Sequence, residues 1–312
     1  MTEQALDAPT HVGTVRTRTS RISQLVTLVA VVVPPLGLAS AMGMLWGVAF
    51  HWVDVALLVS LYVVCAFGTT IGFHRYFTHK GFEARAPIKV ALAVLGCMTV
   101  QGPITQWVTD HRKHHALSDQ EGDPHSPWRF GANTTGLLRG LLFAHCGWLF
   151  QRQWSNRARF APDLLADRDI TRVDRMFGPL VAVSLLAPPV IGGLLSWSWQ
   201  GALTAFFWAS LVRIALLHHV TWSINSICHV YGERPFRTRT ADRAANFWPL
   251  ALISFGESWH NSHHADPTCA RHGVLPGQFD PSARLIWLLE KTGWVHHVRW
   301  PEPQRFAALR QP

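Results

Sequence analysis

Charged residues are scarce in this chain of 312 residues, at 15% of the total, whereas soluble globular proteins usually contain about 25%. Basic residues are missing altogether from two long windows, between Arg21 and Arg75 and between Arg175 and Arg213. The net charge of +9 is therefore concentrated in the other segments, as is typical of a membrane protein with one strongly positive side. The same distribution argues against nucleic acid as a partner.

Cysteine is also sparse, and its pattern excludes two classes of protein. The five cysteines are odd in number and none forms a C-x-x-C pair, so neither a disulfide framework nor a zinc ribbon is indicated. The first 20 residues are polar and lack the pattern of a cleavable signal peptide. We expect residues 1–22 to be a disordered cytosolic tail and residues 23–312 to form a single domain.

The two windows without basic residues are long and apolar. A membrane-spanning helix needs roughly 20 apolar residues, so each window is long enough for two. We predict spans at about 24–49, 52–73, 176–196 and 200–222, paired into two hairpins with short outer turns. A shorter apolar stretch, residues 88–100, cannot span a bilayer and is predicted to be an interfacial helix.

The position of the basic residues predicts the orientation in the membrane. Arg16, Arg18 and Arg21 precede the first span, and both outer turns lack Lys and Arg. Most of the basic charge lies in residues 74–175 and 223–312, so both segments and both termini should be cytoplasmic. We therefore predict an all-α, multi-pass protein of the cell (inner) membrane, with four transmembrane helices in two hairpins and a cytoplasmic helical cap.

Histidine is abundant, with 18 residues, and two segments share the pattern H-x-x-H-H. These segments, residues 111–115 and 260–264, are called box two and box three below. Residues i, i+3 and i+4 lie on one face of an α-helix. Each box therefore predicts a helix that aims three imidazoles at one point.

Two further histidine groups lie next to predicted spans. His74 and His79, called box one, are five residues apart and do not share a face of an ideal α-helix. We therefore expect the second span to end between them and the chain to turn. Asn225 and His229 are four apart and share a face. All these side chains can converge at the cytoplasmic end of the four helices. The remaining histidines are interpreted as surface, loop or core residues: His11, His51, His125, His145, His218, His219, His272, His296 and His297.

The converging histidines are too many for one metal ion, which indicates two. Imidazole suits iron, zinc, copper and nickel. Structural zinc sites are usually closed and often contain thiolates, which are not grouped here. The zinc-protease motif H-E-x-x-H is absent, because the segment from Glu257 to His260 lacks the first histidine. We predict two redox-active iron ions that react with O₂, and no catalytic residues beyond the metal ligands.

The histidine groups and their surroundings resemble a known family, the membrane fatty-acyl-CoA desaturases of the stearoyl-CoA (Δ9) type, and most closely its actinobacterial members. The resemblance runs from about His74 to Trp300. It includes GFHRYFTH at 72–79, DHRKHH at 110–115, GDPH at 122–125, HCGW at 145–148, TWSINSICH at 221–229 and GESWHNSHH at 256–264.

This resemblance implies roles for particular residues. Asn225 would hold a metal-bound water, and four residues would shape the bend of an acyl tunnel: Gln101, Trp107, Thr221 and Trp222. The implied metal ligands are His74, His79, His111, His114, His115, His229, His260, His263 and His264. The implied reaction is the O₂-dependent insertion of a cis double bond, at Δ9, into a saturated acyl-CoA. Two electrons would come from a separate electron-transfer protein or an NAD(P)H-dependent reductase.

The sequence also departs from the family pattern. Thr109 stands where animal members have an arginine, and Gly102 replaces an asparagine used near the cofactor head group. Contacts to CoA phosphates are therefore predicted on charge alone, for Arg112, Lys113, Arg129 and Arg152. Box three begins with His260, whereas front-end desaturases typically have glutamine there. We expect no fused cytochrome b5-like segment, so electrons should arrive in trans on the basic face.

Two other functions compete with desaturation. Membrane alkane or lipid hydroxylases use related histidine clusters, and the two reactions can diverge after the first hydrogen is removed. The product, an alkene or an alcohol, separates them. A metal carrier or heme-binding protein is the other alternative. Transporters place polar ligands near the bilayer midplane, whereas these histidines lie at or beyond the ends of the predicted spans.

Overall fold

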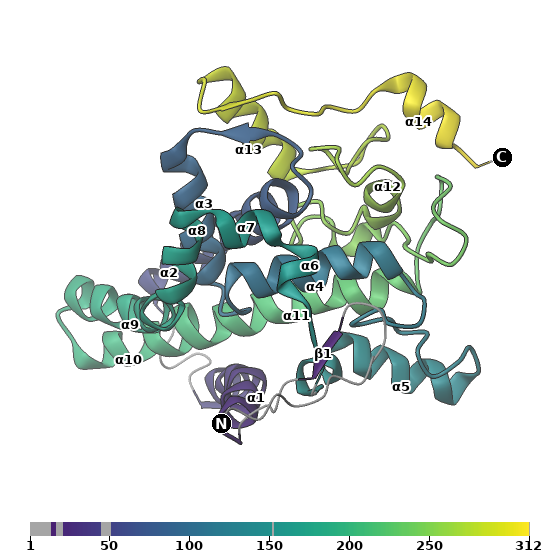
Figure 1. Cartoon of the computed structure of the whole chain (residues 1–312). Coiled ribbons are helices and arrows are strands. Elements are labelled where there is room, and N and C mark those ends of the chain that lie inside the picture. Colours follow the sequence, from purple (N-terminus) through teal and green to yellow (C-terminus); the bar gives the residue numbers. More distant parts are fainter. Residues whose placement is uncertain (1–13, 17–20, 45–50, 152, 312) are drawn as a thin grey trace, which may run out of the picture.

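The computed structural model describes residues 14–16, 21–44, 51–151 and 153–311 of the chain. It is mostly helical (Figure 1). The α-helices are α1 (Arg21–Met44), α2 (Trp52–Phe67), α3 (Ala86–Cys97), α4 (Ile104–Leu117), α5 (Thr134–His145), α6 (Arg157–Phe160), α7 (Pro162–Ala166), α8 (Arg168–Arg175), α9 (Phe177–Ser196), α10 (Trp199–Ala205), α11 (Arg213–Ser226), α12 (His260–Ala265), α13 (Pro281–Lys291) and α14 (Pro303–Leu309). Two π-helices, η1 (Gly68–Thr78) and η3 (Phe206–Val212), and three 3₁₀-helices, η2 (Gly147–Phe150), η4 (Ile227–His229) and η5 (Trp248–Leu250), complete the described helices.

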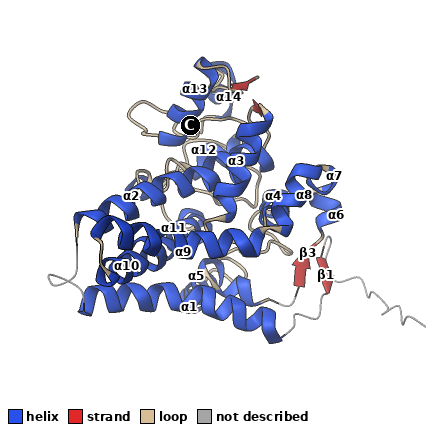
Figure 2. Cartoon of the chain, turned by 90° about the vertical axis from the view of Figure 1, so that its left-hand side faces the viewer, coloured by secondary structure: helices blue, strands red, loops and turns tan. Residues whose placement is uncertain are grey.

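Three continuous helices are long and apolar enough to cross a membrane: residues 52–78, 177–196 and 199–229. They include three of the four expected spans. The first expected span is also helical, as α1, but the apolar helix described there, Gln24–Ser40, is shorter, and residues 45–49 of that span lie outside the described residues. Figure 2 shows α1 along one side of the molecule, where it packs against η3 and α11. The helices thus support membrane association.

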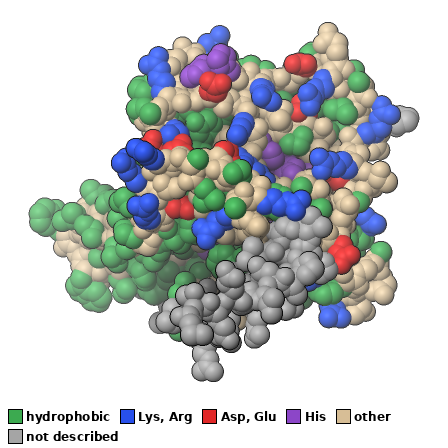
Figure 3. All heavy atoms as spheres, viewed as in Figure 1, with side chains coloured by type: hydrophobic (Ala, Val, Ile, Leu, Met, Phe, Trp, Pro, Cys, Tyr) green, Lys and Arg blue, Asp and Glu red, His purple; other side chains and the backbone are tan. Residues whose placement is uncertain are grey.

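The surface of these helices is apolar where a bilayer would cover it. α9 exposes Leu186, Val190 and Leu194, and Figure 3 shows hydrophobic side chains gathered over α9 and α10. At the outer turns, Trp52 and Trp197 are 86% and 91% exposed. Tryptophan is favoured at membrane interfaces, so these positions fit the ends of spans.

The second span ends between His74 and His79, as predicted for box one, but later than the expected bound at about residue 73. The helix continues to Thr78, wound as the π-helix η1, and His79 caps it. In a π-helix each amide bonds five residues back, and the His79 amide donates to the His74 carbonyl at 3.2 Å. This winding brings the two rings together, with centroids 4.9 Å apart.

Close packing against α3 fixes the position of η1. A Cβ on Gly68 would lie 2.3 Å from the Gly96 backbone nitrogen, and one on Gly96 would lie 2.3 Å from the Phe73 ring. Only glycine permits this approach. α3 is the helix predicted at 88–100, and Ala93 and Cys97 are buried within the main core, so α3 is more than an interfacial cover.

Four short strands form two antiparallel pairs outside the helical core. β1 (Thr14–Arg16) pairs with β3 (Gln153–Ser155), and β2 (Glu83–Ala84) pairs with β4 (Val295–His296). The expectation of a fully disordered tail is therefore wrong at residues 14–16. The rest of the predicted tail before Arg21 lies outside the described residues.

Candidate metal centre

Four helical segments carry the nine histidines that the sequence singled out. η1 supplies box one, α4 supplies box two and α12 supplies box three, while α11 continues through η4 to His229. α4 and α12 confirm that both H-x-x-H-H patterns are helical. The structure gathers all nine side chains into two adjacent groups of potential metal-ligating atoms.

The first group, called cluster one, draws on all three boxes. Its ring nitrogens lie within 4.8 Å of one another. The Nε2 atom of His263 lies 3.0 Å from Nε2 of both His74 and His115. The members of cluster one are His74, His79, His111, His115 and His263.

The second group, called cluster two, contains the other four histidines. The Nε2 atoms of His260 and His229 are 3.1 Å apart. The members of cluster two are His114, His229, His260 and His264. The expectation that each box aims three imidazoles at one point is therefore wrong. The residues of boxes two and three fan across their helix faces, so that each of these two boxes contributes to both clusters, whereas both histidines of box one lie in cluster one.

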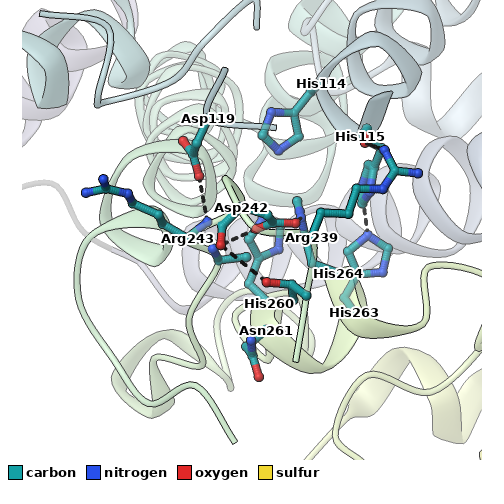
Figure 4. Close-up of polar contacts among 12 residues, drawn as sticks. His114, His115, Asp119, Arg239, Asp242, Arg243, His260, Asn261, His263 and His264 are labelled. Carbon is teal, nitrogen blue, oxygen red and sulfur yellow. Dashed lines mark hydrogen bonds and ion pairs between the residues drawn. The ribbon is translucent and has the colours of Figure 1, made fainter. Parts of the chain in front are cut away.

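Four carboxylates hold the outer ring nitrogens of these histidines, and Figure 4 shows two of them, Asp119 and Asp242. The Nδ1 atom of His264 donates to Asp242 at 2.7 Å, and that of His229 donates to Asp119 at 2.7 Å. His114 Nδ1 lies 3.0 Å from both oxygens of Asp123. His74 Nδ1 bonds Glu257. A carboxylate on Nδ1 fixes the tautomer and leaves the Nε2 lone pair facing the cluster.

The clusters have the chemistry of a metal site. The Nε2 atoms of His79, His114 and His264 are buried and have no hydrogen-bond partner. Burial, followed by the charge of neighbouring histidines, lowers the pKa of His111 and His263 well below the ordinary value. These imidazoles are therefore neutral near pH 7, which is the form that binds a metal. The buried ring nitrogens of the two groups, several of them unpartnered, face one another and fit two metal ions.

Several residues at the site were missed by the sequence reasoning. No spacing rule marks Asp119, Asp242 or Glu257, because each reaches its histidine from another segment. Asp123 lies within the motif at 122–125, which was a usable signal.

One further histidine, His272, was assigned to the surface, loop or core class. The structure places its buried ring 4.4 Å from that of His263, and its Nδ1 atom 3.6 Å from Glu257. Neither ring nitrogen of His272 has a hydrogen-bond partner. His272 therefore lies directly beside cluster one, although nothing in its sequence surroundings indicated this.

A cavity of about 680 Å³ opens beside the clusters, and a smaller one of about 50 Å³ lies between α2 and α11. Four residues line both: Trp107, His111, Thr221 and Asn225. One member of cluster one, His111, is thus placed where the two cavities adjoin. Asn225 lies in α11 one helical turn before His229.

The expected tunnel residues meet at this junction. Trp107 Nε1 donates to Gln101 Oε1 at 3.2 Å, and Gln101 Nε2 donates to Thr221 Oγ1 at 3.0 Å. Trp222 lines the larger cavity. These hydrogen bonds hold the wall in a fixed shape where the two cavities adjoin.

The predicted CoA contacts fall in different places. Lys113 and Arg129 line the larger cavity, and burial lowers the pKa of Lys113. Arg112 instead donates to Asp163 at 2.6 Å and to the Phe77 carbonyl at 2.6 Å, so it ties α4 to neighbouring segments. Arg152 lies outside the described residues.

Asp123 provides a test of the carboxylate supports. Burial raises its pKa, but His114 outweighs this and holds the carboxyl below its ordinary value. Replacing Asp123 with Asn should weaken metal binding by about 10- to 100-fold, because the tautomer of His114 is no longer fixed. Competition with a chelator measures this. The control is Asp169→Asn, which changes a carboxylate of α8 that pairs with Lys89 of α3. An equal loss of metal affinity in this control would contradict a specific role of Asp123.

Apolar helices, two buried histidine clusters and an adjoining cavity are the features of a membrane-associated enzyme that acts on a lipid chain. The sequence matches the fatty acid desaturase family over residues 50–274. The chain belongs to this family and is an oxidoreductase of lipid metabolism. Family membership implies a fatty acyl substrate and O₂, and the family generally uses two iron ions.

Curated relatives cover most of the chain but act on different acyl carriers. A hex-5-enoyl-acyl-carrier-protein acetylenase of Moorena producens is 38% identical over 281 residues, which are 89% of this chain and 87% of the relative. An acyl-CoA C20 Delta5-desaturase of Anemone leveillei is 33% identical over 81% of this chain and 76% of its own length. An sn-1 stearoyl-lipid 9-desaturase of Anabaena variabilis is 32% identical over 80% and 85%, respectively.

Proposed function

We propose that this chain is an O₂-dependent diiron desaturase that inserts a cis double bond into an acyl chain held in the large cavity. The observation that supports this best is the position of His111, which belongs to cluster one and lines both cavities. An alkyl chain passing from one cavity to the other would run directly beside the clusters.

In this proposal the nine histidines hold two iron ions, which when bound would supply the oxidising power to remove hydrogen from an unactivated methylene. The protein's own part is positioning. An alkyl chain has no polar group near the reacting carbons, so only the shape of the cavity wall can determine which methylene groups lie beside the metal ions. The hydrogen-bonded residues Trp107, Gln101 and Thr221 supply that shape. Asn225 would hold a water at the metal centre.

The finer assignments remain predictions. The acyl-CoA form and the Δ9 position came from the resemblance, while the relatives include enzymes named for acyl-carrier-protein, CoA and lipid substrates. We also propose that α1 is the fourth span and that both termini and the histidine clusters face the cytoplasm, as the distribution of basic residues indicates.

The smaller cavity predicts which residue limits chain length. Tyr62 lines it, and the Tyr62 hydroxyl donates to the Ile253 carbonyl at 2.7 Å. Replacing Tyr62 with Ala removes the ring and should shift products toward longer chains, with a change of about 10-fold in the ratio of long to short products. Gas chromatography of the products measures this. Tyr62→Phe keeps the ring and should leave the ratio unchanged; a shift with Phe as well would exclude the ring as the limit.

The first experiment is expression in a desaturase-deficient host, followed by gas chromatography–mass spectrometry of total fatty acids with derivatisation to locate double bonds. We expect a new cis-monoene that is absent with His260→Ala. An alcohol in its place would move the enzyme to the hydroxylases. If no product forms with co-expressed reductases and with CoA-, carrier-protein- and lipid-bound substrates, the proposed function is wrong.

A further inference from the structure

A loop rich in arginine covers the histidine clusters on the side away from the apolar helices. This arginine loop, residues 234–243, follows η4 and precedes η5. Its four arginines are exposed: Arg234, Arg237, Arg239 and Arg243. Its one carboxylate, Asp242, is buried and directed inward to His264. The loop therefore presents a strongly positive outer surface.

The inner side of the arginine loop bonds residues of both clusters (Figure 4). Arg239 Nη1 donates to the backbone carbonyl of His115, in cluster one, at 2.9 Å. Asp242 accepts from His264 Nδ1, in cluster two, at 2.7 Å. The exposed surface is thus one hydrogen bond from a histidine of each cluster.

A third contact adds to this connection. The backbone amide of Arg243 donates to Asp119 at 2.9 Å, and the same carboxylate oxygen accepts from His229 Nδ1. Figure 1 shows this part of the chain beside α12, opposite the turn between α9 and α10. A soluble protein could reach the arginine loop without meeting the apolar surface.

Building on the proposed function, we propose that the arginine loop is the docking surface for an acidic one-electron carrier protein, and that electrons enter beside His115 and His264. The redox balance requires such a carrier. O₂ takes up four electrons in becoming two waters. The two broken C–H bonds supply two electrons and two protons, and the carrier with solvent must supply two more of each. Complementary charge would guide this protein to the loop.

An acidic acyl carrier would also be attracted to positive charge, but the geometry favours the electron donor. None of the described residues lining the large cavity belongs to the arginine loop. Arg243 touches one lining residue, Trp128, with its guanidinium 3.9 Å from the ring centroid. Arg237 bonds the Ala308 carbonyl instead, so its charge can be changed without altering the clusters or that contact.

The test uses the full-length protein, an acidic [2Fe–2S] ferredoxin as the probe, and Arg237→Glu. We expect the Kd for ferredoxin by surface plasmon resonance, and the KM for ferredoxin, to rise about 10-fold at low salt. The difference should shrink at high salt, which screens exposed charges. Desaturation driven by dithionite and the KM for the acyl substrate should stay unchanged.

Arg172→Glu is the matched control, since it makes the same charge change at an exposed position on α8. An equal effect in this control would show that net charge alone matters and would overturn the proposal. A change confined to the KM of the acyl substrate would assign the loop to the acyl carrier and would also overturn it. Absence of dithionite-driven product in the unaltered protein would count against the desaturase function, while the ferredoxin Kd would still test the docking surface.

Discussion

Replacing His263 with Ala should abolish desaturation and remove one iron ion per chain. His263 stands at the centre of cluster one, because its Nε2 atom lies 3.0 Å from those of both His74 and His115. This substitution should lower metal affinity and activity by more than the roughly 10- to 100-fold expected when a residue that only supports a metal ligand is replaced. Product analysis and inductively coupled plasma mass spectrometry measure the two effects.

His260→Ala should give the same loss of activity from cluster two. His297→Ala changes an exposed histidine outside both clusters and serves as the control. Full activity and unchanged iron in His263→Ala would contradict the division of the nine histidines into two metal sites. Loss of both irons from either variant would instead show that the clusters fill together.

Replacing Arg75 with Met should sharply destabilise the protein. Arg75 is buried beneath cluster one, where it donates to Glu257 at 3.0 Å and to Asp280 at 3.0 Å. Removing one partner from a buried ion pair usually costs about 3–5 kcal/mol, because the other charge stays buried and unpaired. Glu257 would also no longer be held by Arg75 in the position where it bonds His74 Nδ1. A lower Tm in detergent and weaker iron retention are the expected results.

Two companion variants separate charge from geometry at Arg75. Arg75→Lys keeps the charge but cannot match the two-carboxylate contact, so it should fall between the Met variant and the unaltered protein. Arg172→Met removes an exposed arginine of α8 and should leave Tm unchanged. If Arg75→Met unfolds at the normal temperature, the ion pairs around η1 contribute little to stability.

Much of this architecture could be predicted because its signals are periodic. The apolar windows have the length of spans, and three of the four expected spans appear as continuous helices. The i, i+3, i+4 spacing of boxes two and three required helices, and α4 and α12 form there. The bond between Gln101 and Thr221 joins two of the residues that the resemblance assigned to the acyl tunnel.

Other features depend on contacts between distant segments, which spacing does not encode. Asp242 reaches His264 across 22 positions, and Glu257 reaches His74 across 183. The π-helical winding of η1 could not be expected from a rule based on α-helical faces, so the second span was predicted at about 52–73, whereas the helix continues to Thr78. The division of boxes two and three between the two clusters depends on where the partner helices lie.

The histidines of each cluster come from segments that lie far apart in the sequence, so metal binding affects how these segments are held together. Cluster one joins η1, α4 and α12, and cluster two joins α4, η4 and α12. Two bound ions would therefore cross-link the C-terminal third of the chain to its first half. Metal affinity in such a site is also folding free energy. A cell short of iron would accumulate a chain whose apolar helices have formed but whose histidine-bearing segments are loosely attached and open to proteolysis.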